Sequence, residues 1–297
     1  MFFTQTIDGK DGWARLFQSV PAFSPLAEAI FARHGLPFSE MANCTPGTNA
    51  VFRVGAYIVK IFAPPESGFS TGADYTAECF GLSRANALGV PAPRLAAYGT
   101  VQDRYRFDYL VMACVPGRAL GEITDSLPAA EKVRIGRALR RFVAWMDTPC
   151  EPFHTRRLRA ADAEARWDCF PDAFRAERAA YLARVPYGAP VYVHGDLTRD
   201  NILVTPEGGI CVIDYADALT APPEVELACV MCEAFQLEKP YLAGFFGTYA
   251  PGALAETCLA GLLLHDFGAN IVRDRFAAPQ DVGNIAVLRR LIRERLS

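Results

Sequence analysis

The sequence has no excess of charge of one sign, no long apolar run and no ordered set of cysteines. Its 297 residues carry a formal net charge of −3, so the composition does not indicate a nucleic-acid partner. No apolar run approaches the roughly 20 residues that a membrane-spanning helix needs, and the first residues lack the basic and apolar regions of a secretory signal. The nine cysteines have no regular spacing and lie mostly among apolar residues, which is typical of buried, reduced thiols. We therefore expect a cytoplasmic protein with no membrane or nucleic-acid partner.

Glycine-rich nucleotide-binding patterns are missing as well. The sequence contains neither G-x-G-x-x-G nor G-x-x-x-x-G-K-[ST], which argues against a Rossmann or P-loop fold. One turn cluster, Thr45-Pro-Gly-Thr-Asn49, joins two strand-like runs and holds a single glycine. Taken alone, this cluster is a hairpin turn. Its position ahead of a strand that carries a lysine makes the backbone of Gly47 and Thr48 a candidate for contacting phosphate groups.

The order of the expected elements divides the chain into two parts. Strands dominate the first part, which also has expected helices at 25–36 and 73–88. The expected strands are 39–44, 50–54, 57–62, 94–98 and 107–115. The later helices are expected at 129–146, 160–184, 223–236, 253–272 and 284–296, interrupted by a hairpin at 191–214. Strands first and helices later indicate an α+β chain of two lobes, 1–113 and 114–297, with Pro116-Gly117 near the hinge.

The segment from Val191 to Tyr215 carries the strongest chemical pattern. It places Asp196 five residues before Asn201, between two short apolar runs, and places Asp214 at the end of a third. Phosphoryl transfer from a nucleotide needs one carboxylate to orient and deprotonate the attacking hydroxyl, and oxygen ligands that hold magnesium on the phosphates. Protein kinases meet this need with H-R-D-x-x-x-x-N and D-F-G. The segment therefore predicts a kinase with Asp196 as its catalytic carboxylate.

Lys60 is the one charged residue in the apolar run Tyr57–Phe62. A lone strand lysine is often a solvent-facing residue that deters edge pairing. The alternative is a lysine that contacts the α- and β-phosphates of a nucleotide and pairs with a helix glutamate. Glu78 lies in the apolar stripe of the helix expected at 73–88, where a carboxylate is unfavourable unless it is paired. A lysine that faces the same core supplies the partner, so we expect a Lys60–Glu78 ion pair.

Together these motifs resemble the aminoglycoside phosphotransferase family, the small-molecule branch of the protein-kinase-like fold, which also includes choline and homoserine kinases. The resemblance rests on Lys60 with Glu78, on Val111–Gly117, on His194–Asn201 and on Ile213-Asp-Tyr215. It implies a two-lobed protein-kinase-like fold, with a small antiparallel sheet plus one helix in the N-terminal lobe and a larger, mainly helical C-terminal lobe. It also implies ATP or GTP as the phosphoryl donor, together with Mg²⁺.

The same resemblance implies a role for each matching residue. These roles are catalysis by Asp196, magnesium binding by Asn201 and Asp214, phosphate binding by Lys60 supported by Glu78, and bracing of the loop by His194. If the strand at 109–115 is the hinge, the backbone of Ala113 and Val115 would bond an adenine edge. The turn at 45–49 departs from the family's pattern, because it has one glycine and a proline.

Two features favour a small-molecule acceptor over a protein acceptor. Thr198 stands where Ser/Thr protein kinases usually have a lysine. Ala221-Pro-Pro-Glu224 resembles the end of a kinase activation segment, yet it begins only seven residues after Asp214. So short a connection cannot form a docking platform for a peptide. We therefore expect a small hydroxyl compound as the acceptor, and no protein partner is implied.

Acidic residues accumulate after the catalytic loop. Ten acids and one base, Lys239, lie between Asp200 and Asn270. If these acids line a cleft, Asp200, Glu233 and Asp266 would attract a cationic acceptor such as an aminoglycoside-type amino sugar, as in an antibiotic-resistance enzyme. If they solvate helix faces, the alternative is a metabolic kinase for a choline-, homoserine- or sugar-type compound. A third alternative, a pseudokinase that binds ligands without turnover, is disfavoured by the complete catalytic set.

Overall fold

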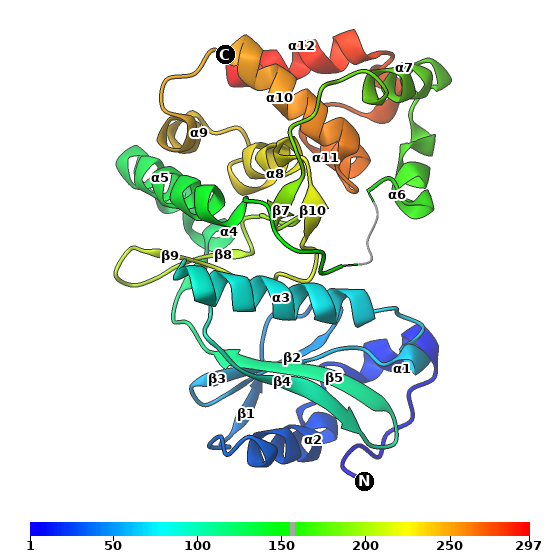
Figure 1. Ribbon diagram of the computed structural model, residues 1–297, viewed down its shortest axis with the longest axis vertical. Coiled ribbons are helices and arrows are strands. Elements are labelled where there is room, and N and C mark those ends of the chain that lie inside the picture. The colour runs from blue at the N-terminus through cyan, green and yellow to red at the C-terminus, as the bar shows by residue number, and fades with distance from the viewer. Residues whose placement is uncertain (155–157) are drawn as a thin grey trace. The chain divides into compact units, whose positions relative to one another are not determined.

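The structure is a computed structural model, and it describes residues 1–154 and 158–297. The described chain forms two compact units, Met1–Pro116 and Gly117–Ser297 (Figure 1). The boundary between these units lies at Pro116-Gly117, whereas the sequence divides the lobes after residue 113. The first unit is built on an antiparallel sheet and the second is mainly helical, so the predicted α+β architecture is confirmed.

A five-stranded antiparallel sheet forms the centre of the N-terminal unit, in the strand order β1-β2-β3-β5-β4. Its strands are β1 (Met41–Asn43), β2 (Ala50–Val54), β3 (Tyr57–Ile61), β4 (Leu95–Gln102) and β5 (Arg106–Ala113). Successive side chains of a strand point to opposite faces. Val59 and Ile61 of β3 therefore share one face and belong to the aromatic core of this unit, whereas Lys60 belongs to the other face.

Three α-helices pack around this sheet within Met1–Pro116, which the structure describes in full: α1 (Gly9–Leu16), α2 (Val20–Arg33) and α3 (Gly72–Leu88). The buried side chains of α2 join the aromatic core on one face, and α3 runs along the other side of the sheet (Figure 1). The sequence missed α1 and started α2 too late, at Pro25. Proline favours helix starts, but Ser19 caps this helix earlier, because its side chain accepts the Ala22 N–H.

The C-terminal unit carries most of the helices. They are α4 (Leu120–Ile123), α5 (Ala129–Met146), α6 (Ala161–Ala165), α7 (Asp172–Leu182), α8 (Pro223–Cys229), α9 (Lys239–Phe246), α10 (Pro251–Leu264), α11 (Gly268–Arg275) and α12 (Ile285–Leu296). Two small sheets lie among them, β6-β8-β9 and β10-β7. Their strands are β6 (Arg118–Ala119), β7 (Val191–Val193), β8 (Ile202–Val204), β9 (Ile210–Val212) and β10 (Leu219–Ala221). In the described part of the chain, no helix is both long and apolar enough to cross a bilayer.

Three long helices expected from the sequence are broken in the structure. The helix expected at 160–184 is interrupted at Phe170-Pro171, because the backbone before a proline is disfavoured in the helical region. The one expected at 253–272 stops at His265, whose backbone is extended. The one expected at 223–236 changes into a π-helical turn at Val230–Ala234. Apolar periodicity continues across all three breaks, so periodicity alone did not reveal them.

Candidate active site

Lys60 and Glu78 meet in the N-terminal unit, between β3 and α3. The Lys60 Nζ atom lies 2.5 Å from Glu78 Oε2, and the two residues are 5% and 0% exposed. The ion pair expected from the sequence is therefore present. A buried glutamate without a cation would be strongly unfavourable, so each residue stabilises the other in this place.

The turn at 45–49 is anchored at one end and open in its middle. The Thr48 carbonyl accepts the Trp13 Nε1–H at 2.8 Å, and the Asn49 side chain accepts the Ala63 N–H at 3.2 Å. Nothing lies within 4 Å of the position where Gly47 would carry a side chain. At the end of β5, the Ala113 N–H is already used by the Arg94 carbonyl. An adenine contact at Ala113 would therefore involve its carbonyl oxygen.

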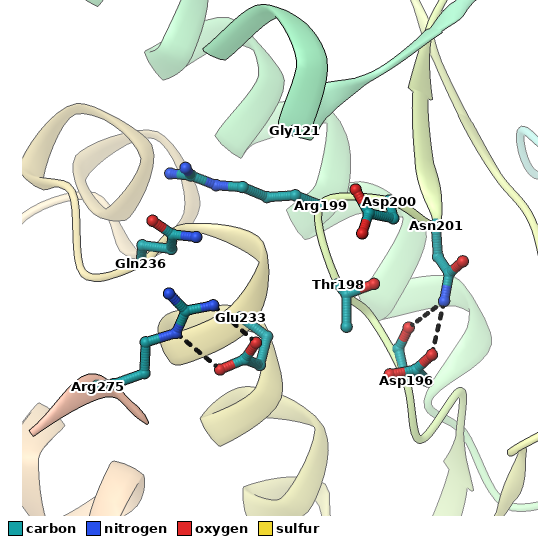
Figure 2. Close-up of a pocket in the computed structure, with 9 residues that line it drawn as sticks. All are labelled: Gly121, Asp196, Thr198, Arg199, Asp200, Asn201, Glu233, Gln236 and Arg275. Carbon is teal, nitrogen blue, oxygen red and sulfur yellow. Dashed lines mark hydrogen bonds and ion pairs between the residues drawn. The ribbon is translucent and has the colours of Figure 1, made fainter. Parts of the chain in front are cut away.

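Asp196 lies in the loop that joins β7 to β8 in the C-terminal unit. The Asn201 side-chain amide donates to the Asp196 carboxylate at 2.8 Å and to the Asp196 backbone carbonyl at 2.9 Å. Both bonds use Asn201 Nδ2, and within residues 1–154 and 158–297 no hydrogen bond reaches Asn201 Oδ1, so this oxygen can act as a ligand. Asn201 thereby holds the Asp196 carboxylate and presents its own oxygen (Figure 2).

Burial raises the pKa of Asp196 to about 7, and the negative charges of Asp217, Asp214 and Glu233 add to this rise. The hydrogen bond from Asn201 opposes it in part. A carboxyl group with a pKa near neutrality is well suited to take up a proton from a hydroxyl group during a reaction. The neighbouring acids therefore adjust the basicity of Asp196.

Two side chains brace the backbone of the loop between β7 and β8. His194 Nδ1 accepts the Asp196 N–H at 3.3 Å, so its Nε2 carries the proton and donates to the Ile213 carbonyl at 3.1 Å. Glu226 of α8 is fully buried and accepts the Gly195 N–H at 3.1 Å. Gly195 has φ of +80°, and a side chain there would clash with the Asp217 carbonyl oxygen. The loop is thus fixed at the Gly195 and Asp196 N–H groups, and the Asn201 amide holds the Asp196 carbonyl.

Asp214 has a left-handed backbone, with φ of +61°. Few residue types other than glycine tolerate this region, and aspartate is one of them. Such strain is typical of functional positions. In the described residues, no group of three or more His, Cys, Asp or Glu side chains is arranged to hold a metal. Magnesium in phosphoryl-transfer sites, however, uses one or two protein oxygens with phosphate oxygens and water, and the Asn201 and Asp214 oxygens fit that donor set.

A polar cavity of about 440 Å³ opens beside the loop that carries Asp196. Its lining includes Asp196 and Asp200 from the loop, Glu233 from the π-helical turn, and two arginines, Arg199 and Arg275 (Figure 2). Arg275 donates to both Glu233 oxygens, at 3.0 and 2.9 Å. The acids of this wall are thus accompanied by two arginines, so the excess of acid in the cavity is smaller than the count over residues 200–270 indicates. The sequence count missed both arginines because they lie just outside residues 200–270.

A second cavity of about 200 Å³ shares Asp196, Thr198 and Glu233 with the first and is also lined by His265 and Asn270. Asp200 and Glu233 thus lie where the sequence predicted acceptor-binding acids. Asp266 is not among the residues that line these two cavities.

A comparison with models of protein families shows the family of the chain. The sequence model described as "Phosphotransferase enzyme family" matches residues 47–262, well over half of the chain. The chain belongs to this phosphotransferase family. No curated protein matches the chain by sequence.

Several solved structures have a fold similar to that of this chain. The GDP complex of wild-type aminoglycoside 2'-phosphotransferase-IIIa is similar, with 15% identity, coverage of 91% of this chain and 97% of that one, and a TM-score of 0.58. A choline/ethanolamine kinase family protein from Mesorhizobium loti matches at 15% identity, 91% and 93% coverage, and a TM-score of 0.56. Choline kinase LicA from Streptococcus pneumoniae matches at 14% identity, 91% and 98% coverage, and a TM-score of 0.52. At such low identity these matches show a shared fold, so the predicted kinase-like fold is confirmed.

Sequence reasoning missed two residues of this candidate site. Glu226 supports the loop that carries Asp196, and Arg275 forms an ion pair with Glu233. A signal for Glu226 was present, because it lies among apolar residues of an expected helix, as Glu78 does. No comparable signal marks Arg275, which follows other charged residues in Arg273-Asp-Arg275.

Proposed function

We propose that the chain is a nucleotide-dependent phosphotransferase that moves the γ-phosphoryl group to a hydroxyl of a small molecule. The observation that carries this proposal is Asp196, held by Asn201 on the wall of a polar cavity, with a pKa raised to about 7. Such a carboxylate is matched to the task of a general base. A binding module without turnover, the pseudokinase alternative, has no need of this arrangement.

In the proposed reaction the acceptor oxygen attacks the γ-phosphorus. The bond from that phosphorus to the β–γ bridging oxygen breaks, and the hydroxyl proton passes to an Asp196 carboxylate oxygen. Catalysis would come mainly from positioning and from neutralisation of phosphate charge. Lys60, held by Glu78, would neutralise the α- and β-phosphates. Bound Mg²⁺, held by Asn201 and Asp214, would supply further positive charge beside the phosphates.

ATP and GTP are both candidate donors. Among proteins of similar fold, aminoglycoside 2'-phosphotransferase-IIIa forms a complex with GDP, and a thermostable mutant of aminoglycoside phosphotransferase APH(4)-Ia forms one with ADP. In this chain we assign the adenine or guanine edge to the backbone at Ala113 and Val115, and phosphate contacts to Gly47 and Thr48. The nine cysteines are all free thiols, which fits the cytoplasmic location that we propose.

The charges of the cavity wall distinguish two acceptor classes. Aminoglycosides, which the related phosphotransferases bind, carry several ammonium groups and would need a wall with a large excess of acid. Here Asp196, Asp200 and Glu233 share the wall with Arg199 and Arg275. The two arginines offset part of this acid, which favours a metabolic acceptor with at most one net positive charge. The second cavity adds Asp274 and no arginine, so acid exceeds base by two residues over both cavities, and an amino sugar with few ammonium groups is the second candidate.

A nucleotide-consumption screen tests the proposal. The panel would contain glycerol, ethanolamine, serine, choline, glucosamine and kanamycin, each with ATP or GTP and magnesium. We expect a wild-type rate above the acceptor-free background with a neutral, zwitterionic or monocationic compound, and loss of that rate in Asp196→Asn. A preference for kanamycin would favour the resistance enzyme over the metabolic one. No acceptor-dependent consumption across the panel would contradict the proposed activity.

A further inference from the structure

The segment 230–238 presents two cavity-lining side chains from a strained backbone. It begins with the π-helical turn, closed by the hydrogen bond from the Phe235 N–H to the Val230 carbonyl. Gln236 and Leu237 then follow with φ of +47° and +62°. Residues other than glycine hold such angles at a cost in free energy, and only where surrounding contacts enforce them. Glu233 and Gln236, both on this segment, line the cavity next to Asp196.

The contacts that hold this segment come from the catalytic loop itself. Arg199 donates from Nε to the Ala234 carbonyl at 3.1 Å and from Nη2 to the Phe235 carbonyl at 3.3 Å. The same guanidinium forms an ion pair with Glu238. The Ala234 and Phe235 carbonyls lie at the end of the π-helical turn. Phe235 precedes the left-handed residues Gln236 and Leu237, and Glu238 follows them. Figure 2 shows Arg199 extending from the loop toward the side of Gln236.

Arg199 lies between the catalytic Asp196 and Asn201 in the sequence, and its side chain is 11% exposed. A planar guanidinium with several fixed donors can bind two carbonyls and a carboxylate at once, which an ammonium group cannot do in the same geometry. The Arg199 side chain therefore connects the loop that carries the general base to the segment that carries Glu233 and Gln236.

We propose that Arg199 is a positioning residue that holds segment 230–238 as the acceptor-selecting wall of the site, in register with Asp196. Glu233, held by Arg275, and Gln236 are the side chains of this wall that contact the acceptor. This inference rests on the proposed phosphotransferase function and adds a determinant of acceptor specificity to it. Misplacement of a substrate by about 1 Å can lower a rate by about 10²-fold, so loosening the wall should affect transfer strongly.

Lys132 offers a matched control for Arg199. Its Nζ atom lies 2.6 Å from the other Glu238 oxygen, but it comes from α5, and within the described residues it makes no hydrogen bond to the Ala234 or Phe235 carbonyls. Lys132→Gln therefore removes a cation from Glu238 and leaves the two carbonyl bonds intact. Arg199→Gln removes both kinds of contact, and Arg199→Lys keeps only the charge beside Glu238.

The experiment compares these three variants with the full-length wild type. Hydrogen–deuterium exchange would be measured over residues 230–238, and transfer would be measured with the panel compound that wild type uses best. For Arg199→Gln we expect faster exchange in this segment, an acceptor kcat/KM lower by about 10²-fold and a nucleotide Kd within about twofold of wild type. Arg199→Lys should lie between Arg199→Gln and wild type, and Lys132→Gln should match wild type. Thermal melting would confirm that each variant is folded.

Several results would overturn the proposal. Wild-type exchange and kcat/KM in Arg199→Gln would show that the segment holds its conformation without this side chain. An equal effect of Lys132→Gln would show that only the charge at Glu238 matters. If wild type uses no panel compound, the proposed function fails, and the exchange comparison alone decides whether Arg199 holds the segment. If Arg199→Gln does not fold, Arg199→Lys with wild-type exchange would count against the proposal.

Discussion

The two units hold their functional charges in contrasting ways. Lys60 and Glu78 project from a regular strand and a regular helix, and they are buried against each other. Asp196, Asn201 and Asp214 lie in loops, one of them in a left-handed conformation, and buried side chains from elsewhere hold these loops. The first arrangement depends on one ion pair and the second on a network. Substitutions should therefore affect mainly folding in the first case and mainly reaction rate in the second.

The largest effect is expected at Asp196. Asp196→Asn keeps the shape of the side chain and removes the general base, so transfer should fall by about 10²–10⁴-fold while nucleotide affinity changes little. Steady-state rates and calorimetric nucleotide binding would measure the two quantities. Glu207→Gln, at an exposed position in the turn between β8 and β9, is the control and should behave as wild type. Turnover within a few-fold of wild type in Asp196→Asn would reject the role of Asp196.

At the Lys60–Glu78 pair, a substitution should lower the stability of the protein as well as its activity. Lys60→Met leaves a carboxylate in a site where Glu78 is 0% exposed, which typically lowers the free energy of unfolding by about 3–5 kcal/mol. Urea unfolding of the single variant and of Lys60→Met/Glu78→Leu would test this expectation. The double variant should recover much of the stability but not the activity. A single variant as stable as wild type would show that the N-terminal unit does not depend on the pair.

The same contrast explains what the sequence could predict. β2 and α5 follow from alternation and helical spacing, because each is one regular element. The Lys60–Glu78 pair joins two elements, and it was predictable because each residue is a charge within the apolar face of a regular strand or helix. The motif at 194–214 is recognisable because catalysis needs certain residue types at fixed spacing. Arg275 and Arg199 find their partners through tertiary packing, which sequence separation does not encode. The π-helical turn at Val230–Ala234 likewise ends at carbonyls that Arg199 bonds, a contact that apolar periodicity does not encode, and periodicity predicted an ordinary helix there.

A substitution of Glu226 would measure how far the loop that carries Asp196 depends on the hydrogen bond from the Gly195 N–H to this buried carboxylate. Glu226→Ala leaves the Gly195 N–H without its acceptor, which typically costs about 1–3 kcal/mol, and it should also lower kcat because Asp196 loses its brace. Glu224→Ala is a matched control on the same helix, since Glu224 accepts the Gly188 N–H at 3.2 Å, away from the loop. Both variants should be less stable in urea, but only Glu226→Ala should lose rate. If Glu226→Ala and Glu224→Ala had the same kcat, Glu226 would have no role in the reaction rate.

A smaller, pH-dependent effect should follow from the raised pKa of Asp196. The base must be deprotonated, so kcat/KM should fall about tenfold per pH unit below about 7 and level off above it. Stability should change in the opposite direction. Because the folded-state pKa lies above the ordinary value of 3.8, the folded protein binds this proton more tightly, and its stability declines as pH rises from about 4 to about 7. Melting curves of wild type and Asp196→Asn should differ in this pH window, and identical pH slopes would contradict the shift.

The smallest effect concerns the charges of the acceptor wall. Exposed charges are screened over about 10 Å at 0.1 M salt. Since two arginines accompany the acids of this wall, raising the salt concentration should increase the KM of a monocationic acceptor such as ethanolamine by only a few-fold. Arg275→Gln frees Glu233 from its ion pair, so it should lower the KM for kanamycin and steepen the salt dependence. Glu233→Gln should do the reverse. A wall that behaved as uniformly acidic would give steep salt dependence in wild type and no change in Arg275→Gln, and that outcome would restore the polycationic acceptor as the better hypothesis.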